Sequence, residues 1–315
     1  MIIPPDAIWT IPCGIIMGAI LLDIILGDPP NRYHPTAWAG RMIAIMIPFR
    51  REKYWGVLVV ITSCGAVVTA AAILLYVTEL LIPLLYIIVS ILILKSTISI
   101  QNMERHANTV HDHIMSDDMR ARVALACIVK RNTINLSTSQ ICSGTIESVA
   151  ENTTDGTTSP LFYMGLFGVL GALVSRTVST IDSMAGYHSE MFGKVGWFGA
   201  NCDTILGWVP ARITAYVMVL SALILQYDYR GAYHAICRDC KKPASLNSGY
   251  TMSAMAGALN ITLEKPGQYT LGTGREACAK DIKDAIRIMK CTSYIFGGIV
   301  CSMAYVMSQV WPWVL

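Results

Sequence analysis

Residues 55–77 read WGVLVVITSCGAVVTAAAILLYV, and after only Thr78 and Glu79, residues 80–100 read LLIPLLYIIVSILILKSTISI. Each run reaches the roughly 20 apolar residues that a helix needs to cross the hydrocarbon core of a bilayer. Two such runs with so short a connection predict a tight hairpin of membrane-spanning helices. The chain is therefore expected to be helical and to lie in a membrane.

The composition of the whole chain agrees with this expectation. Of its 315 residues, 54% are hydrophobic and only 14% are charged, and the mean hydropathy is +0.50. Ordinary soluble domains carry about 25% charged residues, so this chain has too little charge to cover a globular surface in water. The net charge of +3 is too balanced to indicate nucleic-acid binding. A soluble cytosolic enzyme is excluded, and no nucleic-acid partner is expected.

Four further apolar runs extend the pattern. Residues 8–26 and 293–314 are long enough to span a bilayer. Residues 161–174 and 213–225 are shorter, so they are either short spans or helices buried within a bundle. We expect an all-α fold, a polytopic helical bundle that forms a single integral membrane domain over residues 1–315. Cytoplasmic helices and loops are expected to form a site at the membrane face.

Basic residues indicate how the chain is oriented. Five arginines and lysines lie in the segment 27–54 and ten in 228–292, whereas residues 1–7 contain none. By the positive-inside rule, the main polar loops of this multi-pass protein of the cell membrane are cytoplasmic. The segment 179–210 contains only Lys194, which favours the outside if both short helices cross.

A polar turn follows the first apolar run. Residues 27–35 read GDPPNRYHP, in which prolines restrict the backbone and present Asp28, Arg32 and His34 together. This arrangement favours a binding site at the membrane surface. The alternative is a loop that only ends a helix.

A pair of acidic residues lies further along the chain, in the segment ESVAENTTDG. If residues 139–152 are helical, Glu147 and Glu151 lie one turn apart on the same face, where like charges repel unless a cation lies between them. Mg²⁺ prefers one or two carboxylates together with substrate phosphates, and a turn at Asp155 could add a third carboxylate. The alternative is a solvated acidic face.

Other polar residues carry weaker signals. For Arg212 the alternative to a phosphate contact is a side chain that snorkels to the interface, and Lys95 can snorkel without any functional role. Cys237 and Cys240 have a metal-like spacing but lack the second pair of Cys or His residues that a zinc site needs.

In this order, the polar segments resemble the adenosylcobinamide-phosphate synthase family of cobalamin biosynthesis, also called cobinamide synthase. The resemblance covers most of the chain. The matching motifs are Gly27-Asp28-Pro29 with His34-Pro35, Arg131 ahead of Thr133, Glu147 to Asn152 with Asp155-Gly156, Asp182-Ser183-Met184 with Gly186-Tyr187, Pro210-Ala211-Arg212, and Asn247 with Gly249 before Ala256-Gly257-Ala258-Leu259. Six motifs in register make the resemblance specific.

The resemblance implies a membrane-bound carbon–nitrogen ligase. Such an enzyme joins the free propionate of adenosylcobyric acid to aminopropanol or its O-phosphate as an amide, driven by ATP hydrolysis. Because a carboxylate is a poor electrophile, the simplest route is an acyl phosphate. That route requires Mg²⁺, groups that bind phosphates, and an acceptor for the amine proton.

These requirements give each candidate residue a hypothetical role. Glu147, Glu151 and Asp155 are expected to hold Mg²⁺ or the ammonium group, and Glu151 is also a catalytic candidate. His34 or Asp182 is the expected general base. The residues expected to bind substrate or phosphate are Asp28, Arg32, Arg41, Arg176, Tyr187, Asp203, Arg212 and Asn247.

Two other functions stay open at this point. One is a non-catalytic sensor that resembles the AmpE membrane protein of β-lactamase induction, and the other is a transporter for a corrinoid or another anion. Besides the lipid bilayer and the small-molecule substrates, the expected partners are a second copy of the chain or other membrane enzymes of the late corrinoid pathway.

Overall fold

The structure is a computed structural model that describes residues 10–30, 32, 34–47, 52–185 and 194–310. It is mainly helical, as expected, and the chain groups into two compact units. Unit 1 comprises Met1–Ser99, Asp155–Gly207 and Gly297–Leu315, and unit 2 comprises Ile100–Thr154 and Trp208–Phe296. Whether the chain forms a single integral membrane domain stays a prediction.

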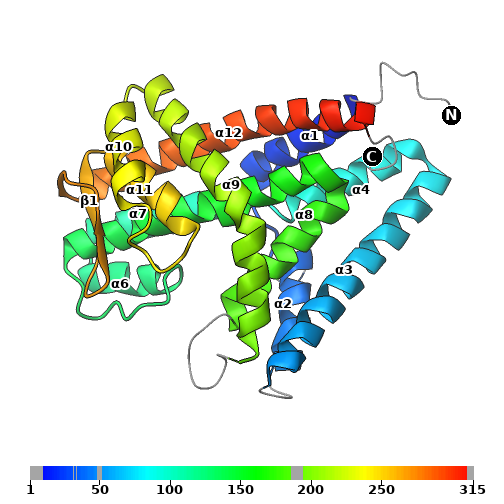
Figure 1. The fold of residues 1–315 in the computed structure, drawn as a ribbon, viewed down its shortest axis with the longest axis horizontal. Helices are drawn as coiled ribbons and strands as arrows, with labels where there is room; N and C mark the ends of the chain where they lie inside the picture. The colour runs from blue at the N-terminus through cyan, green and yellow to red at the C-terminus, as the bar shows by residue number, and fades with distance from the viewer. Residues whose placement is uncertain (1–9, 31, 33, 48–51, 186–193, 311–315) are drawn as a thin grey trace. The chain divides into compact units, whose positions relative to one another are not determined.

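The first four helices belong to unit 1 (Figure 1). They are α1 (Thr10–Leu26), α2 (Pro35–Met46), α3 (Lys53–Leu81) and α4 (Pro83–Lys95). α3 and α4 form the expected hairpin, but the break falls at Ile82 rather than at Thr78 and Glu79. Pro83 explains this position, because it begins α4 and restricts the preceding residue to the extended backbone that Ile82 adopts, with φ −150° and ψ 120°.

A long helical segment occupies the middle of the chain. Its parts are α7 (Thr138–Thr153), the π-helical turn η3 (Thr154–Thr158) and α8 (Ser159–Ala185), followed by α9 (Gly196–Ile224). Asp155 and Gly156, for which a turn was expected, lie within η3. α8 bends at Phe167 and Gly168, where Gly168 has φ 66°, a conformation that glycine adopts without steric cost.

Four of the described helical segments are long and apolar enough to cross a membrane. They are Lys53–Leu81, Pro83–Ile114, Thr138–Ala185 and Gly196–Ile224. The short apolar runs 161–174 and 213–225 therefore belong to helices of full spanning length, because polar residues continue both helices beyond the apolar stretch. The apolar run 293–314 lies within α12 (Ala279–Val310) as far as residue 310, and its last residues lie outside the described part.

Unit 2 combines short helices with a small sheet that the sequence analysis did not predict. The elements are α5 (Ile100–Ile114), α6 (Asp118–Ala126), α10 (Tyr229–Asp239), α11 (Ser248–Ala258), β1 (Ile261–Lys265), β2 (Tyr269–Leu271) and β3 (Arg275–Glu276). β1 lies at the centre of the sheet, antiparallel to β2 and parallel to β3. Ile261 and Leu263 are buried and alternate with less buried residues, which is the two-residue period of a strand. The pattern covers too few positions to be recognised from the sequence.

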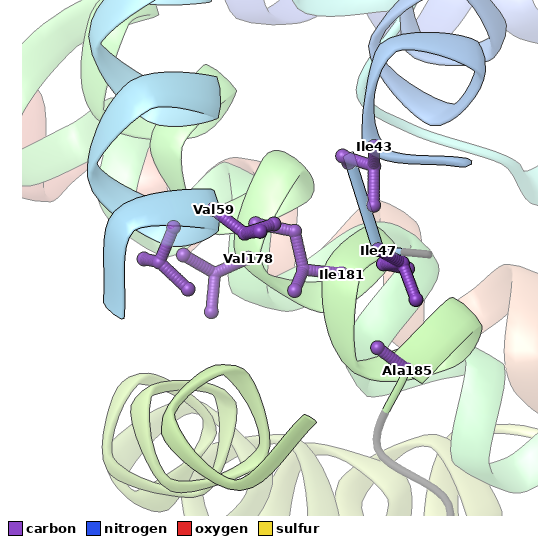
Figure 2. Close-up of a cluster of buried hydrophobic side chains, with 7 residues drawn as sticks. Ile43, Ile47, Val59, Val178, Ile181 and Ala185 are labelled. Atoms are coloured by element: carbon purple, nitrogen blue, oxygen red, sulfur yellow. The ribbon is translucent and has the colours of Figure 1, made fainter. Parts of the chain in front are cut away.

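Each unit has its own apolar core. In unit 1, Ile43 and Ile47 from α2 and its C-terminal cap pack against Val59 of α3 and against Val178 and Ile181 of α8 (Figure 2). The core of unit 2 contains Val110, Ala121, Leu125, Leu136 and Ile141. The first core matters for the site described next, because it fixes α2 against α3 and α8.

Candidate functional site

A buried set of ion pairs joins helices α1 and α4 of unit 1 to the turn that follows α1. Lys95, in the last turn of α4, places its Nζ 2.6 Å from Asp28 Oδ1 and 3.5 Å from Asp23 Oδ1. Asp23 lies on α1 with a fully buried side chain, and the Lys95 side chain is only 8% exposed. The ammonium group of Lys95 therefore ends on two carboxylates, an arrangement that the sequence analysis did not predict.

His34 lies beside this pair and caps the N-terminus of α2. Its Nδ1 accepts a hydrogen bond from the Thr36 backbone N–H at 3.2 Å, so the proton of the neutral ring lies on Nε2. Nε2 is 3.5 Å from Asp28 Oδ1. Burial raises the pKa of Asp28, but hydrogen bonds from His34 and Lys95 outweigh it and hold the pKa below its usual value. Asp28 is thus ionised at neutral pH, and the role of His34 as general base stays a prediction.

Arg176 of α8 and Asp155 of η3 extend this set of charges. Nη1 of Arg176 donates a hydrogen bond to the Asp155 carbonyl at 3.5 Å, and the carboxylates of Asp28 and Asp155 act on the guanidinium electrostatically. The Nε atom of Arg176 is buried and donates no hydrogen bond within the described part of the chain. We call this group the Asp28 cluster. Its members are Asp23, Asp28, His34, Lys95, Asp155 and Arg176.

Two of the expected phosphate-binding arginines line one cavity in unit 1. This cavity of about 450 Å³ is lined by Arg32, Ala37, Gly40, Arg41, Ala44 and Met184. Ala37, Gly40 and Ala44 follow the spacing of one helix face, so α2 presents three small residues there beside Arg41. The carbonyl of Arg32 accepts a hydrogen bond from Trp38 Nε1 at 2.7 Å, which fixes the backbone of this arginine. Two guanidinium groups beside a small apolar wall suit a phosphate or carboxylate on a short carbon chain.

The structure pairs Glu147, one of the residues expected to hold a metal, with an arginine. In unit 2, Glu147 Oε2 lies 3.1 Å from Nη2 of Arg131, and these side chains are only 8% and 13% exposed. Ser143 donates to Glu147 Oε1 at 3.4 Å, and Glu151 is exposed one turn further on. Within the described ranges, no group of three His, Cys, Asp or Glu side chains could hold a metal ion. The geometry makes Glu147 the charge partner of Arg131 and gives no support to a metal site that includes Asp155.

Arg212 and Asn247 meet in unit 2. The Arg212 guanidinium lies between the rings of Trp208 and Tyr250, with Cζ 4.1 Å and 4.4 Å from the ring centroids. Nη1 of Arg212 donates to the Trp208 carbonyl at 2.6 Å and to Asn247 Oδ1 at 3.3 Å. These contacts hold α9 against the start of α11.

Asp182 lies away from the cavity. It is half-buried on α8, two residues from both Thr180 and Met184, whose side chains face Gly40 of α2. At about 100° per residue, Asp182 is turned roughly 200° from that face.

The remaining candidates differ in exposure. Asp203 is half-buried on α9, Cys237 is exposed, Cys240 is buried, and Tyr187 lies outside the described residues.

Lys95 and Arg131 are charged residues to which sequence reasoning gave no role. Lys95 ends an otherwise apolar run, a position that suits a snorkelling residue as well as a buried one. The sequence feature that could have predicted the pairing of Lys95 was Asp23, since a carboxylate within a membrane-spanning segment needs a charge partner. Arg131 belonged to a recognised motif, but its pairing with Glu147 became visible only in the tertiary structure.

The fold and the site define a class of protein: a helical membrane protein with buried ion pairs and an arginine-lined cavity beside α2. The family model described as CobD/Cbib protein matches residues 16–291, and the chain belongs to this family.

Relatives from several organisms match most of the chain. A probable cobalamin biosynthesis protein CobD from Methanothermobacter thermautotrophicus is 36% identical over 285 residues, which cover 90% of this chain and 95% of the relative. One from Archaeoglobus fulgidus is 37% identical over 276 residues, 87% of this chain and 88% of the relative. A cobalamin biosynthesis protein CobD from Leptospira interrogans is 36% identical over 277 residues, 82% of this chain and 84% of the relative. No solved structure was found to match.

Proposed function

We propose that the chain acts in cobalamin biosynthesis as an ATP-dependent ligase. It forms an amide between the free propionate of adenosylcobyric acid and aminopropanol or its O-phosphate. The observation that carries this proposal is the match to the CobD/Cbib family over residues 16–291, with relatives named as cobalamin biosynthesis proteins. The cavity supports it, because a propionate and a phosphorylated donor are both anions that arginines bind.

The reaction needs an activated carboxylate. A propionate oxygen attacks the γ-phosphorus of ATP, the bond to the β–γ bridging oxygen breaks, and ADP leaves. The amine nitrogen then attacks the acyl carbon, the C–O bond to phosphate breaks, and the nitrogen loses a proton. Fixed cationic donors are needed where negative charge develops on the transferring phosphoryl group.

The arginines of the cavity are the best candidates for this contact. Arg32 and Arg41 are both exposed, and each guanidinium can bind two oxygens of one phosphate or carboxylate. Asp28 is a poor proton acceptor, because its pKa is lowered by His34 and Lys95 despite its burial. Asp182 and Glu151, with His34, are the residues to test as general base.

Mg²⁺ is expected to accompany ATP in this reaction. The carboxylates of the described residues do not gather into a ligand group that fits it. We therefore assign Mg²⁺ no ligand in this chain and propose that it enters bound to the ATP phosphates, as Mg²⁺ commonly does.

We place the polar loops on the cytoplasmic side, where ATP is available. Three native cysteines that are exposed in unit 2, Cys127, Cys237 and Cys278, test this orientation. A membrane-impermeant thiol reagent should label them in inverted vesicles and not in intact cells. Labelling from outside intact cells would contradict the orientation.

The activity test uses the purified chain in detergent with ATP, Mg²⁺, adenosylcobyric acid and aminopropanol O-phosphate. We expect an amide product with the corresponding mass and one ADP for each amide formed. Absence of product from folded protein would reject the ligase and favour a sensor or a transporter.

Variants of the cavity sharpen this test. Arg32→Gln and Arg41→Gln should each raise the KM of an anionic substrate by about 10-fold or more, because a hydrogen bond to a charged group contributes about 1.5–3 kcal/mol. Arg105→Gln is the matched control, since Arg105 is an exposed arginine of α5 that does not line the cavity.

A further inference from the structure

We infer that Lys95 is a positioning residue: its buried ion pairs hold the turn between α1 and α2 and thereby set where Arg32 and Arg41 face the cavity. This inference rests on the proposed function only in its choice of anionic ligand. Lys95 itself does not line the cavity, so any effect on ligand binding must pass through the turn.

The first step concerns the ion pairs themselves. The ammonium group of Lys95 ends the apolar helix α4 and lies 2.6 Å from Asp28 and 3.5 Å from Asp23. Asp23 comes from α1, and Asp28 is the second residue after α1 ends. One buried cation therefore ties the C-terminal ends of α1 and α4 to the first residues of the turn.

The second step leads from Asp28 to α2. His34 Nε2 lies 3.5 Å from Asp28, and His34 Nδ1 accepts the Thr36 backbone N–H at the first turn of α2. Thr36 Oγ1 also donates to the Ser96 carbonyl at 2.8 Å, next to Lys95 in the chain. The start of α2 is thus held to the end of α4 in two ways. One is the ionic path through Asp28 and His34, and the other is the neutral hydrogen bond from Thr36 to Ser96.

The third step reaches the arginines. Arg32 lies within the turn that Asp28 and His34 hold at both ends, and its carbonyl is bonded to Trp38 Nε1 at 2.7 Å. Arg41 lies on α2 itself, one turn beyond Ala37. A shift of the turn or of α2 therefore moves both guanidinium groups relative to the cavity that they line.

Stability alone does not explain why charged residues occupy this place. Replacing a buried ion pair by apolar residues of similar volume is often neutral or stabilising. In some proteins a buried polar or ionic group fixes direction and register where apolar contacts do not. A turn that positions two arginines at a cavity requires such a fixed direction and register.

The test compares Lys95→Met with a charge-neutral double variant, Asp28→Asn with Lys95→Met. Binding of aminopropanol O-phosphate and of aminopropanol to the full chain in detergent is measured by calorimetry, together with Tm. We expect Lys95→Met to weaken binding of the O-phosphate by about 10-fold or more, on the scale of one hydrogen bond to a charged group. Binding of aminopropanol should change much less.

The double variant separates positioning from stability. It should recover part of the lost Tm, because no uncompensated charge is left at position 28, while Asp23 still loses its ion pair with Lys95. It should not recover affinity for the O-phosphate. Lys290→Met is the matched control, since Lys290 pairs with Glu104 at 2.7 Å in unit 2 and does not line the cavity. It should leave O-phosphate affinity unchanged.

Two outcomes would overturn the inference. The first is an affinity of Lys95→Met for the O-phosphate that equals the wild-type affinity. If Lys95→Met does not fold, the double variant is measured in its place. The other is a wild-type chain that does not bind the O-phosphate. Product formation is measured separately, so a wild-type chain that binds the O-phosphate without making amide would reject the ligase proposal and leave the positioning result standing.

Discussion

Replacing Glu147 by glutamine removes the charge that faces Arg131 while keeping the shape of the side chain. In the native chain, Glu147 Oε2 lies 3.1 Å from Arg131 Nη2, with 8% and 13% of the two side chains exposed. The Nε and Nη2 atoms of Arg131 are buried and donate no hydrogen bond within the described part of the chain. Glu147→Gln therefore leaves a buried guanidinium without a counter-charge.

The size of the effect follows from this geometry. At 3.1 Å and an effective dielectric constant of about 20, the Coulomb attraction is about 5 kcal/mol before desolvation. Breaking a buried pair by removing one partner costs about 3–5 kcal/mol, whereas removing both charges is often nearly neutral. At about 2–4 °C per kcal/mol, Glu147→Gln should lower Tm by roughly 6–20 °C. Arg131→Met should lower Tm by a similar amount.

The assay is a double-mutant cycle on Tm and on the Mg²⁺ dependence of the proposed amide formation. A charge partner predicts that Arg131→Met with Glu147→Gln regains most of the Tm and that the Mg²⁺ dependence of every active variant matches wild type. If Glu147 instead binds a metal, the double variant should be inactive or should need more Mg²⁺ than wild type. A double variant no more stable than either single variant would refute the charge-partner reasoning.

Three further predictions concern other parts of unit 2. Gly144→Ala should lower Tm, because a Cβ there would collide with the Arg131 guanidinium; a Tm equal to wild type would show that Arg131 can move aside. Arg212→Lys should lower Tm by about 2–8 °C, since lysine cannot fill the space between the Trp208 and Tyr250 rings and cation–π contacts contribute about 1–2 kcal/mol. Burial raises the pKa of Asp239, but the hydrogen-bonded cations beside it lower the pKa from 3.8 to about 2. Its stabilising effect is therefore fully present above pH 3.8 and lost as the pH falls towards 2, and Asp239→Asn should flatten Tm against pH in that range; an unchanged slope would contradict this.

Much of the membrane architecture could be predicted from the sequence, because spanning length is a local property of an apolar run. The hairpin of α3 and α4 and the helical fold class were confirmed. The break at Ile82 could have been found from Pro83 alone, since proline restricts the residue before it. The lengths of α8 and α9 could not be predicted from the sequence, because helices sheltered by neighbouring helices can continue through polar residues such as Arg176.

The candidate site was predictable only in part. The sequence singled out Asp28, Arg32 and His34 as a polar group, and short chain separation is enough to bring them near one another. It also placed Glu147 and Glu151 on one helix face, but it assigned Glu147 to a metal where the structure shows Arg131. A like-charge pair indicates that a cation is needed without indicating which one.

The sequence by itself determined that this chain is helical, has apolar runs long enough to cross a membrane, and concentrates its few charges in short polar segments. Each of these is a property of neighbouring residues. The tertiary structure alone decided which charges pair. Lys95 and Asp28 are 67 residues apart in the chain and 2.6 Å apart in space. A buried charge must find a counter-charge on whatever helix packs against it, and that neighbour is set by packing and not by local sequence.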